Sequence, residues 1–251
     1  MNRWAFDIGN TRIKCAPVSE DDTLGPVTAI AHAGAGQAYA ELAALLPPRG
    51  GSAYVCSVAP VQVSLPLIEL LATRFRCVSL ARSTNRFAGV SNAYPVPPRL
   101  GVDRFLALVA ARARGPGAWL VCGVGTALTV DLLDSQGRHR GGRIAPSPAL
   151  MRTALHQAAP HLPSGGGQGP IFAVDTEDAL ASGCDGAALG LIYGSLADAA
   201  RVLGCAPGVL LHGGGAFPLV GRVQGAQHEP SLVLHGLARW ARAAAAAPAN
   251  L

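Results

Sequence analysis

Two short segments that lie half a chain apart share one pattern, and this repeat limits the folds available to the chain. Each has an apolar run, a tight turn containing glycine and a second β-rich run, and the turns are Asp7–Thr11 and Gly123–Ala127. When the segments are aligned, Gly9 and Gly125 coincide, at an offset of 116 positions in a chain of 251 residues. A strand–glycine–strand unit is common by chance, but two at a half-chain offset indicate an ancient duplication.

The rest of the chain alternates apolar strand-like runs with helical patterns, which predicts an α/β fold built from two similar halves. A predicted helix over Leu100–Arg114 is stopped by Gly115-Pro116-Gly117, so the predicted domains are residues 1–115 and 116–251. We expect a cleft between the two halves that grips a nucleotide from both sides. Near the end of the chain, Ser231–Leu234 is predicted as a strand and Leu237–Ala247 as a helix.

The first turn has the composition of a loop that binds nucleotide phosphates. Glycine at the bend lets backbone N–H groups approach an anion closely, and Asn10, Thr11 and Lys14 add side-chain donors. Lys14 is the only lysine in the chain, and the Asp7 carboxylate suits Mg²⁺, directly or through water. The Walker pattern, which needs Gly-Lys-Ser/Thr at the start of a helix, is not present here. An ordinary hairpin with a polar turn explains the same residues equally well.

Asp103 and Arg104 stand at the start of a predicted helix, shortly after a proline-rich loop that contains Tyr94. An aspartate there can simply complement the helix dipole, which is worth about 0.5–1 kcal/mol. A kinase, however, needs a carboxylate that orients or accepts the proton of the attacking hydroxyl, and a cation that holds the acceptor or the phosphoryl group. An adjacent Asp–Arg pair supplies both groups.

Composition excludes several other classes of protein. The net charge of +5 draws anionic ligands, but the basic residues are scattered and no aromatic–basic pattern indicates nucleic-acid binding. The six cysteines form no Cys-x-x-Cys pair and most lie in apolar strand-like runs, so we expect no disulfides. The N-terminus enters a strand directly, without a leader pattern. We expect no apolar segment to approach the roughly 20 residues that a membrane-spanning helix needs. We therefore expect a cytoplasmic protein without a membrane span.

Together these segments resemble the type III pantothenate kinases, within the acetate and sugar kinase/Hsp70/actin superfamily. The resemblance runs along almost the whole chain, and its specificity comes from the order and spacing of the motifs. Those motifs are Asp7–Thr11, Ser57–Pro60, Asn92–Tyr94, Gly101–Arg104, Gly125–Asp131, Gly141–Pro146, Thr176 with Gly183, and Gly213-Gly214.

The resemblance implies duplicated ribonuclease H-like (actin-like ATPase) domains, each with a mixed sheet flanked by helices. It implies ATP-dependent phosphorylation of pantothenate to 4′-phosphopantothenate, the first committed step toward coenzyme A, by a homodimer that uses Mg²⁺. Two alternatives stay open. One is the same fold acting on a sugar, another small alcohol or polyphosphate, and the other is a nucleotide-binding accessory protein of transcriptional regulation with weak or lost kinase activity.

The resemblance also implies a role for each candidate residue. Asp103 is the expected proton acceptor for the primary hydroxyl of pantothenate. The expected ATP-binding residues are Asp7, Gly9, Asn10, Thr11, Lys14 and Thr126, with Asp7 positioning Mg²⁺ and Asp131 as a second candidate metal ligand. The expected pantothenate pocket contains Tyr94, Gly101, Val102, Arg104 and Thr176, with Thr176 coming from the partner subunit.

The sequence departs from the family at three positions. The second hairpin usually opens with an acidic residue that helps to bind a monovalent cation, K⁺ or NH₄⁺, but this position is Gly123. Monovalent-cation dependence is therefore open from sequence. The family's Thr-Gly-Gly near the end reads His212-Gly213-Gly214 here, and Ser147 follows Pro146 where glycine is common. We interpret His212 as a hydrogen-bonded structural residue in preference to an adenosine contact.

Overall fold

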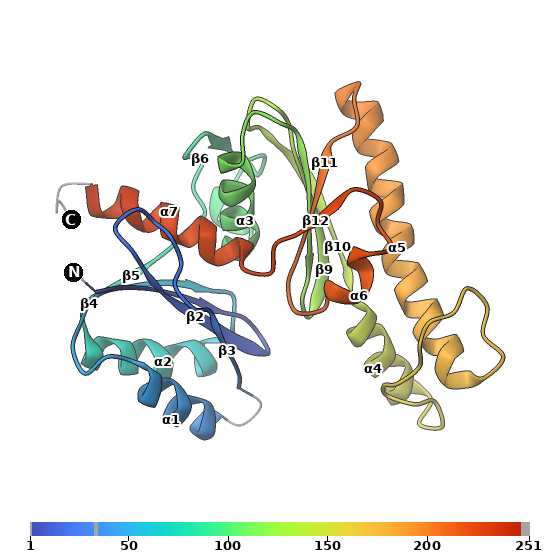
Figure 1. The fold of residues 1–251 in the computed structure, drawn as a ribbon, viewed down its shortest axis with the longest axis horizontal. Coiled ribbons are helices and arrows are strands. Elements are labelled where there is room, and N and C mark those ends of the chain that lie inside the picture. The colour runs from blue at the N-terminus through green and yellow to red at the C-terminus, as the bar shows by residue number, and fades with distance from the viewer. Residues whose placement is uncertain (1, 33–34, 247–251) are drawn as a thin grey trace. The chain divides into compact units, whose positions relative to one another are not determined.

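A computed structural model of the chain describes residues 2–32 and 35–246, which form two compact units (Figure 1). The first unit groups the described residues of Met1–Ala113 with those of Ser231–Leu251, and the second unit is Arg114–Pro230. The predicted division into residues 1–115 and 116–251 differs from this in its C-terminal part, because the last helix groups with the first unit.

The first unit contains a five-stranded sheet, a two-stranded ribbon and four α-helices in its described part. In chain order its elements are β1 (Arg3–Ile8), β2 (Arg12–Val18), β3 (Thr28–Ala31), α1 (Ala35–Leu45), β4 (Gly50–Ser57), α2 (Val61–Arg74), β5 (Phe75–Leu80), β6 (Arg86–Phe87), β7 (Val90–Ser91), a 3₁₀ turn at Pro97–Arg99, α3 (Val102–Ala113) and α7 (Leu232–Ala246).

The second unit contains a five-stranded sheet and three α-helices. Its elements are β8 (Trp119–Val124), β9 (Ala127–Leu133), β10 (His139–Pro146), α4 (Pro148–Ala158), α5 (Thr176–Leu203), β11 (Gly208–His212), α6 (Phe217–Val220) and β12 (Ala226–His228).

The two sheets have the same topology. The strand order is β3-β2-β1-β4-β5 in the first and β10-β9-β8-β11-β12 in the second. In each sheet the first three strands in this order are antiparallel, and the central strand pairs in parallel with the fourth. The fourth strand pairs in parallel with the fifth. This shared order confirms the predicted α/β class and the internal duplication inferred from the two turns.

The core of the first unit fixes the direction of the side chains on β1. Trp4, Phe6 and Ile8 pack with apolar residues of α1 and α2, and the Phe6 ring meets that of Phe75 edge to face. Because neighbouring residues of a strand point to opposite faces, Asp7 points to the other face of the sheet. Helix α7 lies on that other face, opposite α1 and α2 (Figure 1).

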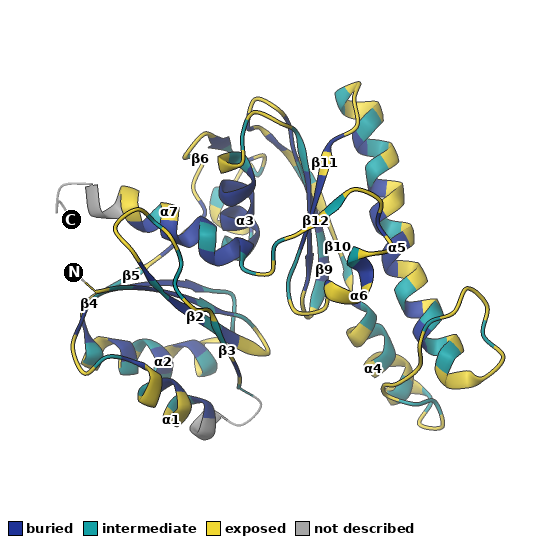
Figure 2. Cartoon of the chain, viewed as in Figure 1, coloured by how far each residue is buried: buried dark blue, intermediate teal, exposed yellow. Residues whose placement is uncertain are grey.

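Helix α3 is buried along most of its length, as its dark colour shows (Figure 2). All eight residues from Arg104 to Ala111 are buried. Its principal partner is α7, and the two backbones approach closely, because a Cβ atom on Gly236 would lie 2.0 Å from the carbonyl oxygen of Leu106. The start of α3, where Asp103 stands, is therefore held by packing along the rest of the helix.

The predicted strand at Ser231–Leu234 is wrong, because this segment is the first turn of α7. The amide of His235 donates to the carbonyl of Ser231 at 3.0 Å, the first bond of the helix. Leu234, Leu237 and Ala241 are all fully buried, at intervals of three and four residues, which is a helical spacing. A run as short as Leu-Val-Leu fits a buried strand or a buried helix equally well, and only its packing against α3 decides between them.

Replacing Gly236 by alanine is expected to lower the free energy of unfolding by about 1–3 kcal/mol, because the added methyl group must push α7 away from the α3 backbone. Urea unfolding of the purified variant measures this loss. Gly221→Ala is the matched control, since Gly221 has a helical φ of −71° and a Cβ there meets nothing within 4 Å. Equal stability of the two variants would contradict the close approach of α3 and α7.

Candidate active site

Strand pairing in the first sheet sets three polar side chains in one row. Asp7 on β1 is directly opposite Lys14 on β2 and directly opposite Cys56 on β4. Residues that are paired across strands point to the same face, so the carboxylate lies between an ammonium group and a thiol. The Cys56 thiol donates a hydrogen bond to Asp7. Sequence reasoning missed Cys56, because nothing in the sequence reveals which residue of β4 pairs with Asp7.

The electrostatics of this row are dominated by burial. The pKa of Asp7 is raised to about 7, chiefly by burial and then by the nearby Asp103 carboxylate, while Lys14 and the Cys56 hydrogen bond oppose the rise. Burial also lowers the pKa of Lys14, against the opposing effect of Asp7. The pKa of Cys56 is raised well above its ordinary value by burial and by the two carboxylates. Two carboxylates and one lysine in a partly dry site favour an added cation.

The turn after β1 is held in a fixed shape by the end of β3. The Gly9 amide donates to the carbonyl of Arg12 at 3.0 Å, and His32 donates twice, from Nε2 to the Gly9 carbonyl at 2.8 Å and from its amide to the Thr11 carbonyl at 3.2 Å. The side chains of Asn10 and Thr11 are exposed at the tip. The turn therefore presents polar groups on a rigid backbone, and His32 is a supporting residue that the sequence did not identify.

Asp103 stands at the first turn of α3 with one oxygen already engaged. Its Oδ1 accepts a hydrogen bond from the amide of Arg104 at 2.8 Å. Gly101 makes room for this carboxylate, because a Cβ on Gly101 would lie 2.7 Å from the same oxygen. Asp103 lies near enough to Asp7 for its negative charge to raise the pKa of Asp7. The structure thus brings Asp7, Lys14 and Asp103 together within the first unit.

Arg104 and Tyr94 form a contact beside Asp103. The Arg104 side chain, whose residue is only 7% exposed, donates from Nη1 to the Tyr94 hydroxyl at 3.3 Å, and its guanidinium lies 6.0 Å from the ring centre. The Tyr94 loop is fixed by Asn92, whose Nδ2 donates to the carbonyls of Thr84 and Pro97 while its Oδ1 accepts from the Tyr94 amide. Val102 precedes Asp103 in the same turn of α3, partly exposed.

The remaining predicted residues lie in the second unit. Thr126 is exposed at the tip of the β8–β9 turn, which is closed by a hydrogen bond from the Gly125 amide to the Ala127 carbonyl at 2.9 Å. Asp131 is 2% exposed, and its Oδ1 lies 2.9 Å from Nε2 of the buried His139. Among the described residues, no cluster of three or more His, Cys, Asp or Glu side chains is arranged to hold a metal ion.

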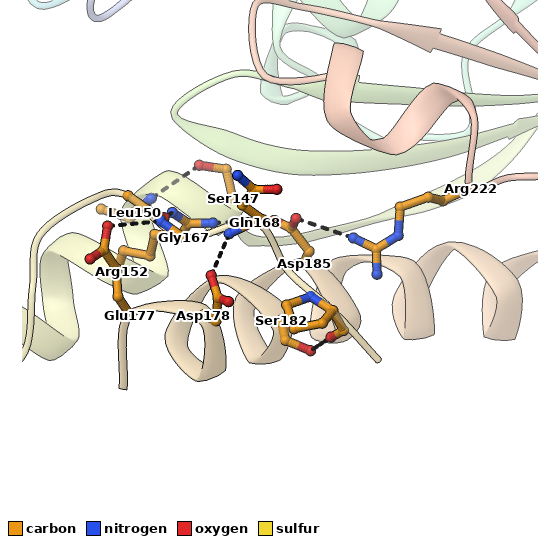
Figure 3. A network of polar contacts seen from close by, with 12 residues as sticks. Ser147, Leu150, Arg152, Gly167, Gln168, Glu177, Asp178, Ser182, Asp185 and Arg222 are labelled. Atoms are coloured by element: carbon orange, nitrogen blue, oxygen red, sulfur yellow. Dashed lines mark hydrogen bonds and ion pairs between the residues drawn. The ribbon is translucent and has the colours of Figure 1, made fainter. Parts of the chain in front are cut away.

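Thr176 begins α5, beside a loop that is bonded to the first turns of that helix (Figure 3). Asp175 caps the helix by accepting from the Asp178 amide at 2.9 Å. The carboxylates of Glu177 and Asp178 accept from the loop amides of Gly167 and Gln168 at 2.9 and 2.7 Å. Arg152, Ser182, Asp185 and Arg222 extend this network.

Helix α5 is also long and apolar enough to cross a membrane by length and composition alone, with a mean hydropathy of 1.2 over its best window. The statement that no apolar segment approaches about 20 residues is therefore wrong. The helix is rich in alanine and glycine, which raise hydropathy without large side chains. In the structure it packs Ala188, Leu189 and Ile192 against the second sheet, and 28% of its most apolar window is buried.

The repeated five-stranded sheets with one shared strand order are those of an actin-like ATPase fold. The type III pantothenate kinase family matches residues 4–198, and the chain belongs to this family. The type III pantothenate kinase of Stenotrophomonas maltophilia strain K279a is 51% identical over 241 residues, which is 96% of this chain and 98% of the relative.

Two solved structures confirm the predicted actin-like ATPase fold. Component A of the (R)-2-hydroxyglutaryl-CoA dehydratase from Acidaminococcus fermentans superposes with a TM-score of 0.59 at 11% identity, covering 98% of this chain and 100% of its own. A ROK family glucokinase from Streptomyces griseus, solved with glucose and AMPPNP, gives a TM-score of 0.50 at 12% identity, covering 97% and 100%.

The raised pKa of Asp7 predicts a specific pH dependence of stability. The folded protein keeps the proton on Asp7 up to about pH 7, whereas the unfolded chain releases it near about pH 3.9. Between these values the folded state binds more protons, so this contribution to stability falls as the pH rises. Thermal unfolding in EDTA is expected to show the wild type losing stability relative to Asp7→Asn from pH 5 to pH 8. Parallel curves for the two proteins would contradict the assigned shift.

Proposed function

We propose that this protein transfers the γ-phosphoryl group of ATP to pantothenate, giving 4′-phosphopantothenate in the first step of coenzyme A biosynthesis. The observation that carries the proposal is the family relationship over nearly the full chain, combined with Asp103 in the first turn of α3 beside Asp7 and Arg104. The curated relatives at about 50% identity are named type III pantothenate kinase.

Asp103 is proposed to orient the primary hydroxyl of pantothenate and to accept its proton. A primary alcohol is a poor nucleophile, so transfer depends on in-line positioning and on neutralising phosphate charge. Gly101 leaves space for the carboxylate, and the Arg104 amide holds one of its oxygens. Arg104 and Tyr94 supply a cation and a hydroxyl for polar groups of pantothenate, with Gly101 and Val102 lining the same pocket.

The turn after β1 is proposed to bind the phosphates of ATP. Gly9, Asn10, Thr11 and Lys14 offer backbone and side-chain donors, and Thr126 offers a hydroxyl at the tip of the second hairpin. Asp7 fits a divalent cation, because its carboxylate lies near that of Asp103 and carboxylate oxygens are good ligands for such an ion. When bound, Mg²⁺ neutralises charge on the phosphates. The buried pair of Asp131 with His139 favours a structural role for that aspartate.

The direct test is to incubate the purified protein with Mg-ATP and pantothenate and to detect 4′-phosphopantothenate by mass spectrometry. The variant Asp103→Asn is expected to fold normally and to lose about 10²–10⁴-fold in kcat, because the proton acceptor is removed. Circular dichroism of the variant is the control for folding. Near-native kcat would rule out Asp103 as the base. No product from protein that still binds ATP would favour another alcohol acceptor or a regulatory role.

A homodimer is proposed as the functional unit, with Thr176 acting in the pocket of the partner subunit. The loop before Thr176 is tied to α5 at Gly167 and Gln168, yet it leaves Ile171, Phe172 and Val174 exposed at 90%, 92% and 103%. Three solvent-exposed apolar side chains on an anchored loop favour burial against another chain. A second copy that covers this loop would also bring Thr176 to a subunit interface.

The variant Phe172→Asp is expected to weaken the dimer at least about tenfold, because a carboxylate would replace a buried ring at the interface. Analytical ultracentrifugation over a concentration series measures the dissociation constant. Val61→Asp is the matched control, since Val61 is an exposed apolar residue on α2 of the first unit. A monomeric wild type, or equal dissociation constants for the two variants, would contradict this interface.

The cytoplasm is the proposed location for two reasons. All six cysteines are free thiols, and the proposed substrate, ATP, is a cytoplasmic metabolite. We propose no direct nucleic-acid contact, since the arginines form no continuous basic tract in the sequence.

A further inference from the structure

Gly123 in the second sheet holds the same place as Asp7 in the first. Each is the second-last residue of the central strand, which is β8 in the second sheet and β1 in the first. Asp7 pairs with Lys14 on the antiparallel neighbour and with Cys56 on the parallel neighbour. Gly123 pairs in the same way with Thr129 and with His212. The duplicated frame therefore has a carboxylate at this row in one unit and no side chain in the other.

The space beside Gly123 is filled by the two neighbours in its row. A Cβ on Gly123 would lie 2.8 Å from Nε2 of His212 and 2.8 Å from Oγ1 of Thr129. Contacts below 3.0 Å do not occur for real Cβ atoms, so no side chain fits at position 123 while the imidazole keeps its place. His212 and Gly123, two separate departures from the family in sequence, are thus one arrangement in space.

The loop after His212 fixes the backbone that carries the imidazole. Gly213 has a φ of +93°, and a Cβ there would lie 2.4 Å from the carbonyl oxygen of Val124. The Gly215 amide donates to that same carbonyl at 2.9 Å. Only glycine combines this left-handed backbone with so close an approach to β8. The end of β11 is therefore held against the end of β8, and His212 remains over Gly123.

We propose that His212 takes the place of the acidic side chain and monovalent cation at this row, so that the chain turns over without K⁺ or NH₄⁺. A hard monovalent cation is held by oxygen ligands, carboxylates and carbonyls, whereas imidazole suits softer metals. The row offers one hydroxyl, from Thr129, and no carboxylate, and the ring occupies the space between the strands. The residues present do not fit the cation. The inference about turnover rests on the proposed kinase function, but the inference about binding does not.

Two measurements on the wild type test this separately. The first is the rate of 4′-phosphopantothenate formation with Mg-ATP in KCl or in choline chloride at equal ionic strength, and equal rates are expected. The second is thermal unfolding in the same two salts, and equal melting temperatures are expected. A K⁺-specific rise in melting temperature, or product formed only with K⁺, would overturn the inference while leaving the proposed kinase intact. Absence of product in both salts would reject the kinase, and the unfolding comparison would still decide the cation question.

Variants at positions 123 and 212 test whether these two residues cause the expected indifference to K⁺. The double variant Gly123→Asp/His212→Thr removes the ring and supplies a carboxylate, and K⁺ is expected to raise its melting temperature by about 2–4 °C relative to choline. Gly123→Asp alone is expected to unfold at a lower temperature, because the new side chain meets the imidazole. His161→Thr, which changes an exposed histidine, is the matched control and should behave as the wild type. A double variant as indifferent to K⁺ as the wild type would contradict the part assigned to His212 and Gly123.

Discussion

The register of the central strand in each sheet is the constraint on which both candidate rows depend. In the first unit, burial of Trp4, Phe6 and Ile8 on one face leaves Asp7 on the other. A slip of one residue would turn the carboxylate into the apolar core and expose the large rings, so the core itself fixes the register. The same register determines that Lys14 and Cys56 are the neighbours of Asp7. The chemistry at this point is thus a consequence of how the core packs.

Burial gives the row its electrostatic character. A carboxylate on the surface would ionise near its ordinary pKa, but Asp7 is raised to about 7 by burial and by Asp103. Lys14 is pushed in the direction of its neutral form by the same burial. Lys14 and the Cys56 hydrogen bond offset only part of the effect of burial on Asp7, so added positive charge would stabilise its ionised form. A divalent cation bound with a polyphosphate would supply that charge, in agreement with the proposed phosphoryl transfer.

The sequence predicted the α/β class, the duplication and the family, because these depend on periodicity and on the order of motifs. It predicted the start of α3 to within two residues, since Pro97 and Pro98 precede a strong helical pattern. It did not predict that Leu232–Leu234 is helical, or that the last helix groups with the first unit, because both depend on packing against α3. Cys56 and His32 were missed for a related reason. Each supports a site residue across a pairing or loop contact that leaves no local signal.

Duplication explains why two departures from a family pattern can be one structural change. Both sheets place the second-last residue of the central strand between an antiparallel and a parallel neighbour. The side chains at these three positions therefore occupy one shared space on the same face of the sheet. In the first unit the strands share that space among Asp7, Lys14 and Cys56. In the second, loss of a side chain at Gly123 leaves room that the imidazole of His212 fills. The same replacement is not possible in the first row, because a ring in place of Cys56 would displace the Asp7 carboxylate. The half of the duplication without the carboxylate is therefore the one free to change its neighbours.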